Sequence, residues 1–171
     1  MKADTWLLYD LPEQLVTDWY NLQIFNEYDM QDATNYWIRR EFERTRSENW
    51  SVRTQPSLKM SGGRIVKPDI VIFKNSVAYD VLELKCHLDG VRETLLDEDL
   101  DKLKEMKTQW NLRHAYQLVL YDDDDVLRLV HDKEPWMKQY LTFVGANVRR
   151  HASRRMRQGY EDSRAQWVRW K

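Results

Sequence analysis

Cysteine is almost absent from the chain, because Cys86 is the single one among 171 residues. No disulfide can form within the chain, so the fold must be held by packing, as expected in a reducing compartment. We therefore expect a cytoplasmic protein. Eight Trp, nine Tyr and four Phe supply large side chains for the core of a single domain spanning residues 1–171.

Long apolar runs are also missing. No segment approaches the ~20 apolar residues that a membrane-spanning helix needs, and the N-terminal MKADTWLLYDLPEQ is too acidic for a signal peptide. Zinc-ligand spacing is absent as well, since the histidines form no pairs and one cysteine alone could join them. We expect neither a membrane partner nor a zinc site.

A large net charge is lacking too, at −1 overall, but the charge is unevenly distributed. Residues 1–133 carry 18 Lys/Arg against 25 Asp/Glu, whereas residues 134–171 carry 9 against 3. The basic part lies in an expected C-terminal helical extension over residues 134–171.

The pattern of apolar residues predicts an α/β fold. Spacings of three and four predict helices over residues 11–26 and 30–46, and alternation predicts a strand over residues 50–54. Residues 69–73 and 77–85 read as an antiparallel hairpin, followed by a helix ending near residue 110 and strands at 115–121 and 126–130. A long helix should then run over residues 135–159. We expect a central mixed sheet of about four or five strands flanked by helices.

Carboxylates and a lysine gather in the expected hairpin. The side-chain period of two puts Glu83 and Lys85 on the same face of their strand. Asp69 joins that face if Phe73 pairs with Val77, or if Lys74 pairs with Ala78, whereas a register of the other parity turns Asp69 away. Two carboxylates beside an ammonium group suit a hard divalent cation and phosphodiester hydrolysis.

The residues Pro68-Asp69, followed after thirteen residues by Glu83-Leu84-Lys85, resemble the PD-(D/E)XK motif of the restriction-endonuclease-like nuclease superfamily. The resemblance covers about residues 30–121, and the expected order of elements agrees with a core of helix, three antiparallel strands, helix and strand. It implies a restriction-endonuclease-like core and a metal-dependent DNA endonuclease that hydrolyses phosphodiester bonds.

The resemblance also implies roles for individual residues. Asp69, Glu83 and the backbone carbonyl of Leu84 would bind Mg²⁺ or Mn²⁺. Lys85 would position or deprotonate the attacking water, or stabilise the charge of the transition state, and the sequence does not separate these roles. Gln55 stands where some relatives have an acidic ligand, which puts a second metal ion in doubt.

Many relatives add a glutamate from the helix before the first strand. Glu41 and Glu43 are the candidates, and Glu41 is favoured as a catalytic residue because it continues the stripe of Ala33 and Trp37. Glu27 and Asp32 are less favoured.

The segment that begins with Asp99 and contains Lys102 resembles the D-x-x-K-L-like start of the helix that follows the motif in part of the superfamily. Lys102 would then face the phosphate, although a surface lysine paired with Glu98 or Glu105 is the competing interpretation. Gln117 and Tyr121 have the Q-x-x-x-Y spacing of exonuclease relatives, but they fall on an expected strand and are discounted.

Arginines cluster near the end of the last expected helix, where the helix dipole already favours cations. Arginines and tryptophans in such number also suit phosphates and unstacked bases, so we expect DNA contacts there. A homodimer or protein-partner interface is the competing use. The expected nucleic-acid-binding residues are Arg149, Arg150, Arg154, Arg155 and Arg157, together with Lys102.

Two other functions remain open at this point. One is a catalytically inactive, nuclease-like protein that binds DNA or supports an assembly. The other is a DNA-binding regulator that acts through the terminal arginines, with the hairpin only structural. The first differs from the nuclease in lacking cleavage, and the second in binding DNA independently of metal.

Overall fold

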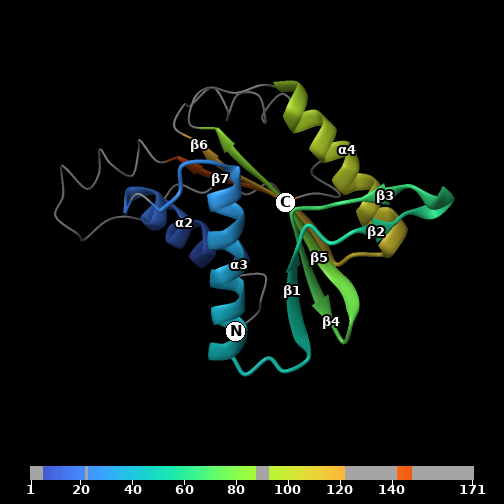
Figure 1. The fold of residues 1–171 in the computed structure, drawn as a ribbon, viewed down its shortest axis with the longest axis horizontal. Helices are drawn as coiled ribbons and strands as arrows, with labels where there is room; N and C mark the ends of the chain where they lie inside the picture. The colour runs from blue at the N-terminus through green and yellow to red at the C-terminus, as the bar shows by residue number, and fades with distance from the viewer. Residues whose placement is uncertain (1–5, 22, 88–92, 122–141, 148–171) are drawn as a thin grey trace.

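The computed structural model describes residues 6–21, 23–87, 93–121 and 142–147, which form an α/β fold around one central sheet (Figure 1). The sheet has five strands in the order β1-β4-β5-β6-β7, and β2 and β3 form a small separate sheet. The central strands are β1 (Trp50–Thr54), β4 (Ile70–Lys74), β5 (Val77–His87), β6 (His114–Tyr121) and β7 (Thr142–Asn147). The small sheet consists of β2 (Leu58–Lys59) and β3 (Ile65–Val66), joined through the 3-10 turn η2 (Ser61–Gly63).

The central sheet is mixed. β1, β4 and β5 are antiparallel neighbours, whereas β5 and β6 run parallel, as do β6 and β7. Parallel neighbours need a long crossover, and α4 (Glu93–Trp110) provides it between β5 and β6. The sheet is therefore antiparallel on the side of β1 and parallel on the side of β7.

The remaining helices precede the sheet in the chain. The π-helical turn η1 (Trp6–Asp10) leads into α2 (Leu11–Tyr20), and α3 (Glu27–Arg44) follows. Asn26 caps α3, because its side-chain oxygen accepts the backbone N–H groups of Tyr28 and Asp29 at 2.8 and 3.0 Å. This cap makes Glu27 the first residue of α3, three residues before the start expected from periodicity.

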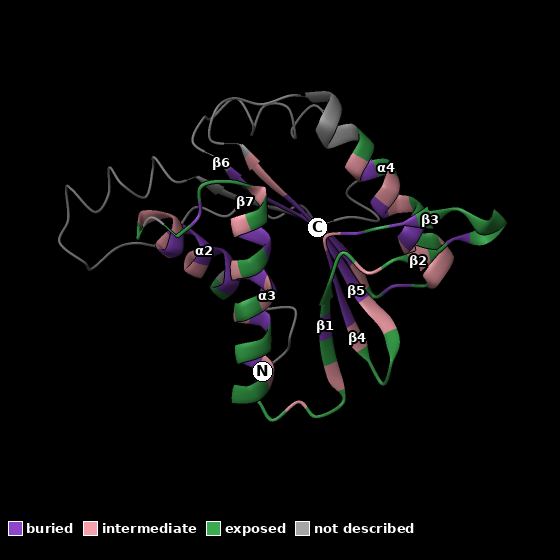
Figure 2. Ribbon diagram, in the orientation of Figure 1, coloured by how far each residue is buried: buried purple, intermediate pink, exposed green. Residues whose placement is uncertain are grey.

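Two apolar clusters cover the two faces of the sheet (Figure 2). On one face, α2 and α3 pack through Leu15 and Ile38 against residues that include Leu82 and Leu84 of β5. On the other face, Leu103 of α4 belongs to the cluster that contains Val81. Burial of these side chains supplies the main favourable term for the fold. Alternate residues of β5 thus face α3 or α4.

Most elements expected from the sequence are present. The first strand is confirmed at Trp50–Thr54, and the hairpin, the helix ending at Trp110 and the following strand are confirmed with shifts of a few residues at their ends. The first expected helix stops at Tyr20, well before residue 26. The expected strand at residues 126–130 lies outside the described residues.

The long helix expected over residues 135–159 is wrong where the structure can be compared with it. Thr142–Asn147 form β7, which pairs with β6 in parallel, Val144 opposite Leu118. Steps of four in a short apolar segment do not distinguish a helix from a buried strand, and pairing with β6 decides the outcome. The other residues of the expected helix and of the C-terminal extension lie outside the described part of the chain.

Within the described residues, none of the helices is both long enough and apolar enough to cross a lipid bilayer.

Candidate metal centre

The turn between β4 and β5 sets the first part of the hairpin register. Asn75 and Ser76 both have positive φ angles, 51° and 64°, which is the pattern of the type I′ turn that suits two-residue hairpins. Lys74 pairs with Val77 across this turn, so neither pairing considered from the sequence is formed. Continued without interruption, this register would turn Asp69 away from Glu83.

A β-bulge next to the turn reverses that outcome. Tyr79 is the additional residue of β5, and beyond it the register is shifted by one position. Ile70 therefore pairs with Leu82, and Asp69, one position further, lies opposite Glu83. The bulge places the two carboxylates of the sequence motif across from each other.

The Asp69 side chain is held by backbone and side-chain donors. Its Oδ2 atom accepts the backbone N–H of Leu84 at 2.8 Å. Gln31 of α3 donates from Nε2 to the backbone carbonyl of Asp69 at 3.2 Å and reaches its Oδ1 atom at 3.5 Å. Leu84 thus contacts Asp69 through its backbone N–H, whereas the motif resemblance implies a role for its backbone carbonyl.

Glu83 is buried at the centre of the site, with 1% of its surface exposed. Burial raises its pKa to about 8, and the negative charge of Asp69 acts in the same direction, while Lys102 opposes the rise. The Nζ atom of Lys102 lies 2.6 Å from Glu83 Oε1 and also donates to the backbone carbonyl of Lys67 at 3.1 Å. A carboxylate kept from water beside a second carboxylate is stabilised by any cation that binds between them.

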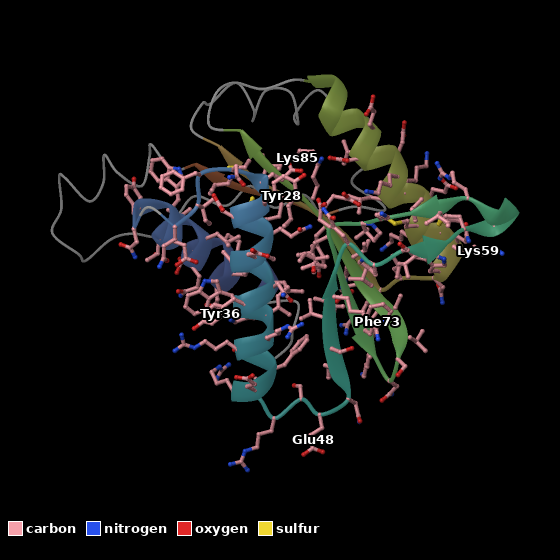
Figure 3. All side chains as sticks on the ribbon, viewed as in Figure 1. Tyr28, Tyr36, Glu48, Lys59, Phe73 and Lys85 are labelled. Atoms are coloured by element: carbon pink, nitrogen blue, oxygen red, sulfur yellow. The ribbon has the colours of Figure 1, made fainter. Side chains whose placement is uncertain are left out.

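Lys85 lies where β5 approaches the N-terminus of α3 and the helix α4 (Figure 3). Its Nζ atom is 3.0 Å from Asp99 Oδ2 and 3.3 Å from Glu27 Oε2. Burial alone would lower the pKa of Lys85, but the charges of Asp99 and Glu27 outweigh it and raise the pKa above its usual value. Lys85 is therefore held as a cation, which suits stabilisation of negative charge and not removal of a proton from water.

Glu27 and Asp99 complete the site. Sequence reasoning ranked Glu27 below Glu41 as the helical glutamate and gave Asp99 no role as ligand or catalyst. Burial raises the pKa of both carboxyl groups, Lys85 lowers each, and Asp69 raises each. The signals for them were present in the sequence: Asn26 is a good N-cap directly before Glu27, and Asp99 begins the segment that contains Lys102.

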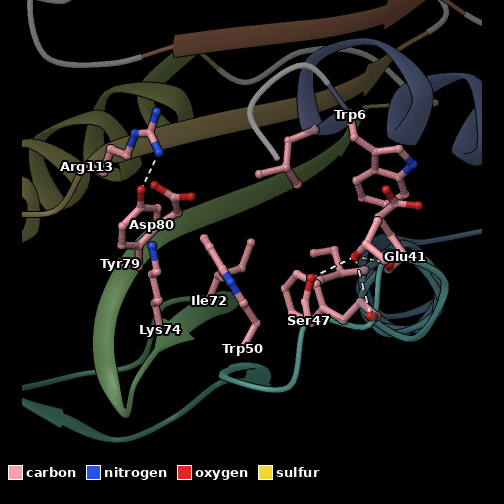
Figure 4. Close-up of a pocket in the computed structure, with 13 residues that line it drawn as sticks. Trp6, Glu41, Ser47, Trp50, Ile72, Lys74, Tyr79, Asp80 and Arg113 are labelled. Atoms are coloured by element: carbon pink, nitrogen blue, oxygen red, sulfur yellow. Dashed lines mark hydrogen bonds between the residues drawn. The ribbon is translucent and has the colours of Figure 1, made fainter. Parts of the chain in front are cut away.

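The structure places Glu41 away from the other residues of the site. Its carboxylate is paired with Arg44, with nitrogen–oxygen distances of 2.6 and 2.7 Å, and it lines a cavity near the C-terminal end of α3 (Figure 4). Glu41 lies fourteen positions after Glu27 on the same helix, which corresponds to about 21 Å along the axis. Since Glu27 contacts Lys85, Glu27 and not Glu41 is the glutamate that α3 brings to the site.

Lys102 does not form the surface pairs considered from the sequence. Its partner is Glu83, whereas Glu105 is paired with Arg64 of the loop before β3. Lys102 thus points from α4 to the sheet, on the side where Glu83 lies. The five arginines expected to bind DNA, at positions 149, 150, 154, 155 and 157, lie outside the described residues.

β6 contributes a buried amide next to Glu83. Gln117 is opposite Glu83 in the parallel register and has 1% of its surface exposed. Gln117 and Tyr121 both lie on β6, so the strand expected for them is confirmed. The exonuclease motif with the same spacing lies on a helix, and the two residues were discounted for that reason.

The donor set of the site consists of carboxylates and ammonium groups. In the part of the chain that the structure describes, no group of three or more His, Cys, Asp or Glu side chains is placed to hold a metal ion. Mg²⁺ is commonly held by one or two carboxylates while several water ligands remain, and Asp69 opposite Glu83 provides such a pair. Burial and the charge of Asp69 raise the pKa of Glu83 in spite of Lys102, so further positive charge near this pair would favour its ionised form. Asp69 and Glu83 are therefore the two carboxylates that would hold such an ion, with water as its other ligands.

No known protein family matches the chain, and no curated protein is similar enough to it to count as a match.

Proposed function

We propose that the protein is a Mg²⁺- or Mn²⁺-dependent deoxyribonuclease of the PD-(D/E)XK type that cuts DNA as an endonuclease. The observation that carries the proposal is the opposition of Asp69 and Glu83 across β4 and β5, with ammonium groups from β5 and α4 beside them. Hydrolysis of a phosphodiester needs neutralisation of the phosphoryl oxygens and an activated water, and this combination of groups suits both needs.

The order of elements supports the same proposal. α3, the antiparallel strands β1, β4 and β5, then α4 and β6 follow one another in the order that the motif resemblance implies for a restriction-endonuclease-like core. Fold order alone does not establish activity. The proposed activity therefore rests on the side chains at the site, above all Asp69 and Glu83.

Each residue of the site has a distinct part in the proposal. A divalent cation would supply a water of lowered pKa and positive charge at the phosphate, with Asp69 and Glu83 as its carboxylate ligands. Lys85, held protonated by Asp99 and Glu27, would stabilise the charge that develops on the phosphoryl oxygens. Lys102 offsets the charge of Glu83 and lies where it could also contact the substrate.

A second candidate is a catalytically inactive protein that binds DNA or supports an assembly. It is favoured by one observation: Lys85 and Lys102 are both already engaged in ion pairs with carboxylates of the same site. A network of this kind also satisfies its own charges and could serve only the fold. Cleavage of DNA distinguishes the two candidates.

The proposal is tested by incubating the full chain with supercoiled plasmid, linear duplex and branched DNA, each with Mg²⁺ and with EDTA. We expect nicked, linear or resolved products in Mg²⁺ alone. If none of the substrates is cut in Mg²⁺ or Mn²⁺, the nuclease proposal fails. DNA binding that persists in EDTA without any cleavage would then support the inactive candidate.

A further inference from the structure

A cavity lies at the opposite end of α3 from Glu27. It encloses about 400 Å³ between η1, the C-terminal end of α3 and the hairpin of β4 and β5 (Figure 4). Buried Leu7, Ile38 and Ile72 contribute apolar surface to it. A volume of this size and a mainly apolar lining are usual for sites that bind small molecules. It shares no residue with the candidate metal centre.

Asp80 supplies a buried acceptor to this cavity. The side chain has no exposed surface, and its Oδ1 atom accepts the backbone N–H of His114 at 3.0 Å. The Oδ2 atom is buried and, within the described part of the chain, has no hydrogen-bond partner. An unpaired buried carboxylate oxygen is costly, so a ligand that donates an N–H to it would gain affinity.

The other carboxylate of the cavity does not have this need. Glu41 is held by Arg44 through both of its oxygens, so its charge is already balanced. Asp80 is therefore the acceptor that a ligand would address.

Aromatic rings form the wall next to the hairpin. The rings of Trp50 and Phe42 have centroids 5.8 Å apart, and those of Trp50 and Tyr79 have centroids 4.9 Å apart. Trp6 of η1 also lines the cavity and is seen beside Glu41 (Figure 4). Such rings favour a flat, polarisable ligand, because stacking adds to the gain from burial.

Cations line the mouth on the hairpin side. The exposed Lys74 places its Nζ atom 5.2 Å from the Trp50 ring centroid and 5.4 Å from that of Tyr79. Arg113 is also exposed, lines the cavity and donates to the Tyr79 hydroxyl. These charges oppose entry of an organic ammonium ion, which aromatic walls and a carboxylate could otherwise hold. They favour a ligand with an anionic group outside the cavity.

We infer that this cavity binds a guanine nucleotide, with the base among the aromatic rings, its N–H donors on Asp80 and its phosphate at Lys74 and Arg113. Guanine fits better than adenine because its Watson–Crick edge presents two adjacent N–H groups that Asp80 Oδ2 can accept, whereas the ring nitrogen on the same edge of adenine is itself an acceptor. The nucleotide is either free or a base extruded from a nucleic-acid strand, and both sources present the same groups.

The inference is tested by isothermal titration calorimetry on the full chain in EDTA, which prevents metal-dependent cleavage. One arm uses guanosine 5′-monophosphate, compared with adenosine 5′-monophosphate and with ribose 5-phosphate. The other arm uses a thymidine oligonucleotide with one central guanine, compared with the same strand without guanine. Binding in the first arm identifies a free nucleotide, and guanine-dependent binding only in the second identifies an extruded base.

Two variants assign the binding to this cavity. Asp80→Asn removes the charged acceptor and should weaken binding about ten- to a hundredfold, and circular dichroism checks that it folds. Lys74→Ala changes an exposed side chain, should leave the fold unchanged, and should weaken binding about three- to tenfold with less dependence on salt. Lys59→Ala, an exposed lysine on β2 that does not line the cavity, is the matched control.

The inference is overturned if neither the mononucleotide nor the guanine-containing strand binds. It is equally overturned if binding occurs but Lys74→Ala and a folded Asp80→Asn variant bind as tightly as the original chain. Because every arm is run in EDTA, these results do not depend on whether the protein cuts DNA.

Discussion

The Oδ2 atom of Asp69 accepts the backbone N–H of Leu84 at 2.8 Å. Through this bond the side chain that precedes β4 is fixed to the backbone of β5, between the two motif residues Glu83 and Lys85. The bond fixes the orientation of the carboxylate and contributes to the stability of the hairpin.

Asp69→Ala should therefore lower the free energy of unfolding by about 1–3 kcal/mol, because the half-buried N–H of Leu84 loses its acceptor. Asp69→Asn should cost less, since the amide oxygen still accepts this bond. Urea unfolding followed by circular dichroism measures both. Asp101→Ala, an exposed aspartate on α4, is the control and should change stability by less than about 0.5 kcal/mol. Equal stability of the two Asp69 variants would contradict the structural role of the bond.

The pKa of Glu83, about 8 against an ordinary 4.5, gives a signed dependence of stability on pH. Between these values the folded metal-free protein binds a proton that the unfolded chain has lost, so stability falls as pH rises from about 4.5 to about 8. The slope from this group is at most about 1.4 kcal/mol per pH unit.

Thermal and urea unfolding in EDTA across this pH range measures that slope. Glu83→Gln has no titrating group at this position and should show a flatter dependence than the original chain. Adding Mg²⁺ to the original chain should also flatten it, because the cation favours the ionised carboxylate. A slope unchanged by both the substitution and Mg²⁺ would mean that Glu83 is ionised throughout.

Lys85→Ala should lower the rate of DNA cleavage by about 10²–10³-fold, the usual effect of removing a group that stabilises transition-state charge. Single-turnover rates on plasmid DNA at saturating Mg²⁺ measure this loss. Lys59→Ala, an exposed lysine on β2 that lies apart from Lys85, should retain the original rate (Figure 3). Equal rates for Lys85→Ala and the original chain would remove Lys85 from the proposed chemistry.

The helices and strands that form the site can be predicted from local sequence, whereas the residue pairing between the strands cannot. The Asn-Ser turn between two apolar runs predicts the hairpin, and the alternation of β5 predicts that Glu83 and Lys85 share a face. The bulge at Tyr79 was not predicted, because both registers considered assumed a regular ladder. The correct opposition of Asp69 and Glu83 depends on that one additional residue.

The helical residues of the site illustrate a different limit. Periodicity identifies which face of α3 is buried, but it does not show which end of the helix meets Lys85. Glu27 and Glu41 both belong to this helix of 18 residues, near opposite ends. The partner of Lys102 likewise lies on another element, so local spacing favoured Glu98 or Glu105. β7 was missed for a similar reason, since its strand state depends on pairing with β6.

Ser76→Gly should stabilise the protein by about 0.5–1 kcal/mol, because glycine adopts the positive φ of 64° at this turn with less strain than serine. The gain appears as a higher midpoint of urea unfolding with an unchanged slope. Ser57→Gly is the control: this exposed serine lies outside the positive-φ residues and should gain nothing from the change. Equal shifts in the two variants would contradict the turn geometry.

The most direct test of the proposed activity is the rate of plasmid nicking in Mg²⁺ by the original chain and by Asp69→Asn, each checked for folding. We expect nicking by the original chain, none in EDTA, and a loss of at least about 10²-fold in the variant. Nicking that persists in EDTA, or that is equally fast in Asp69→Asn, would contradict a metal centre built on Asp69 and Glu83.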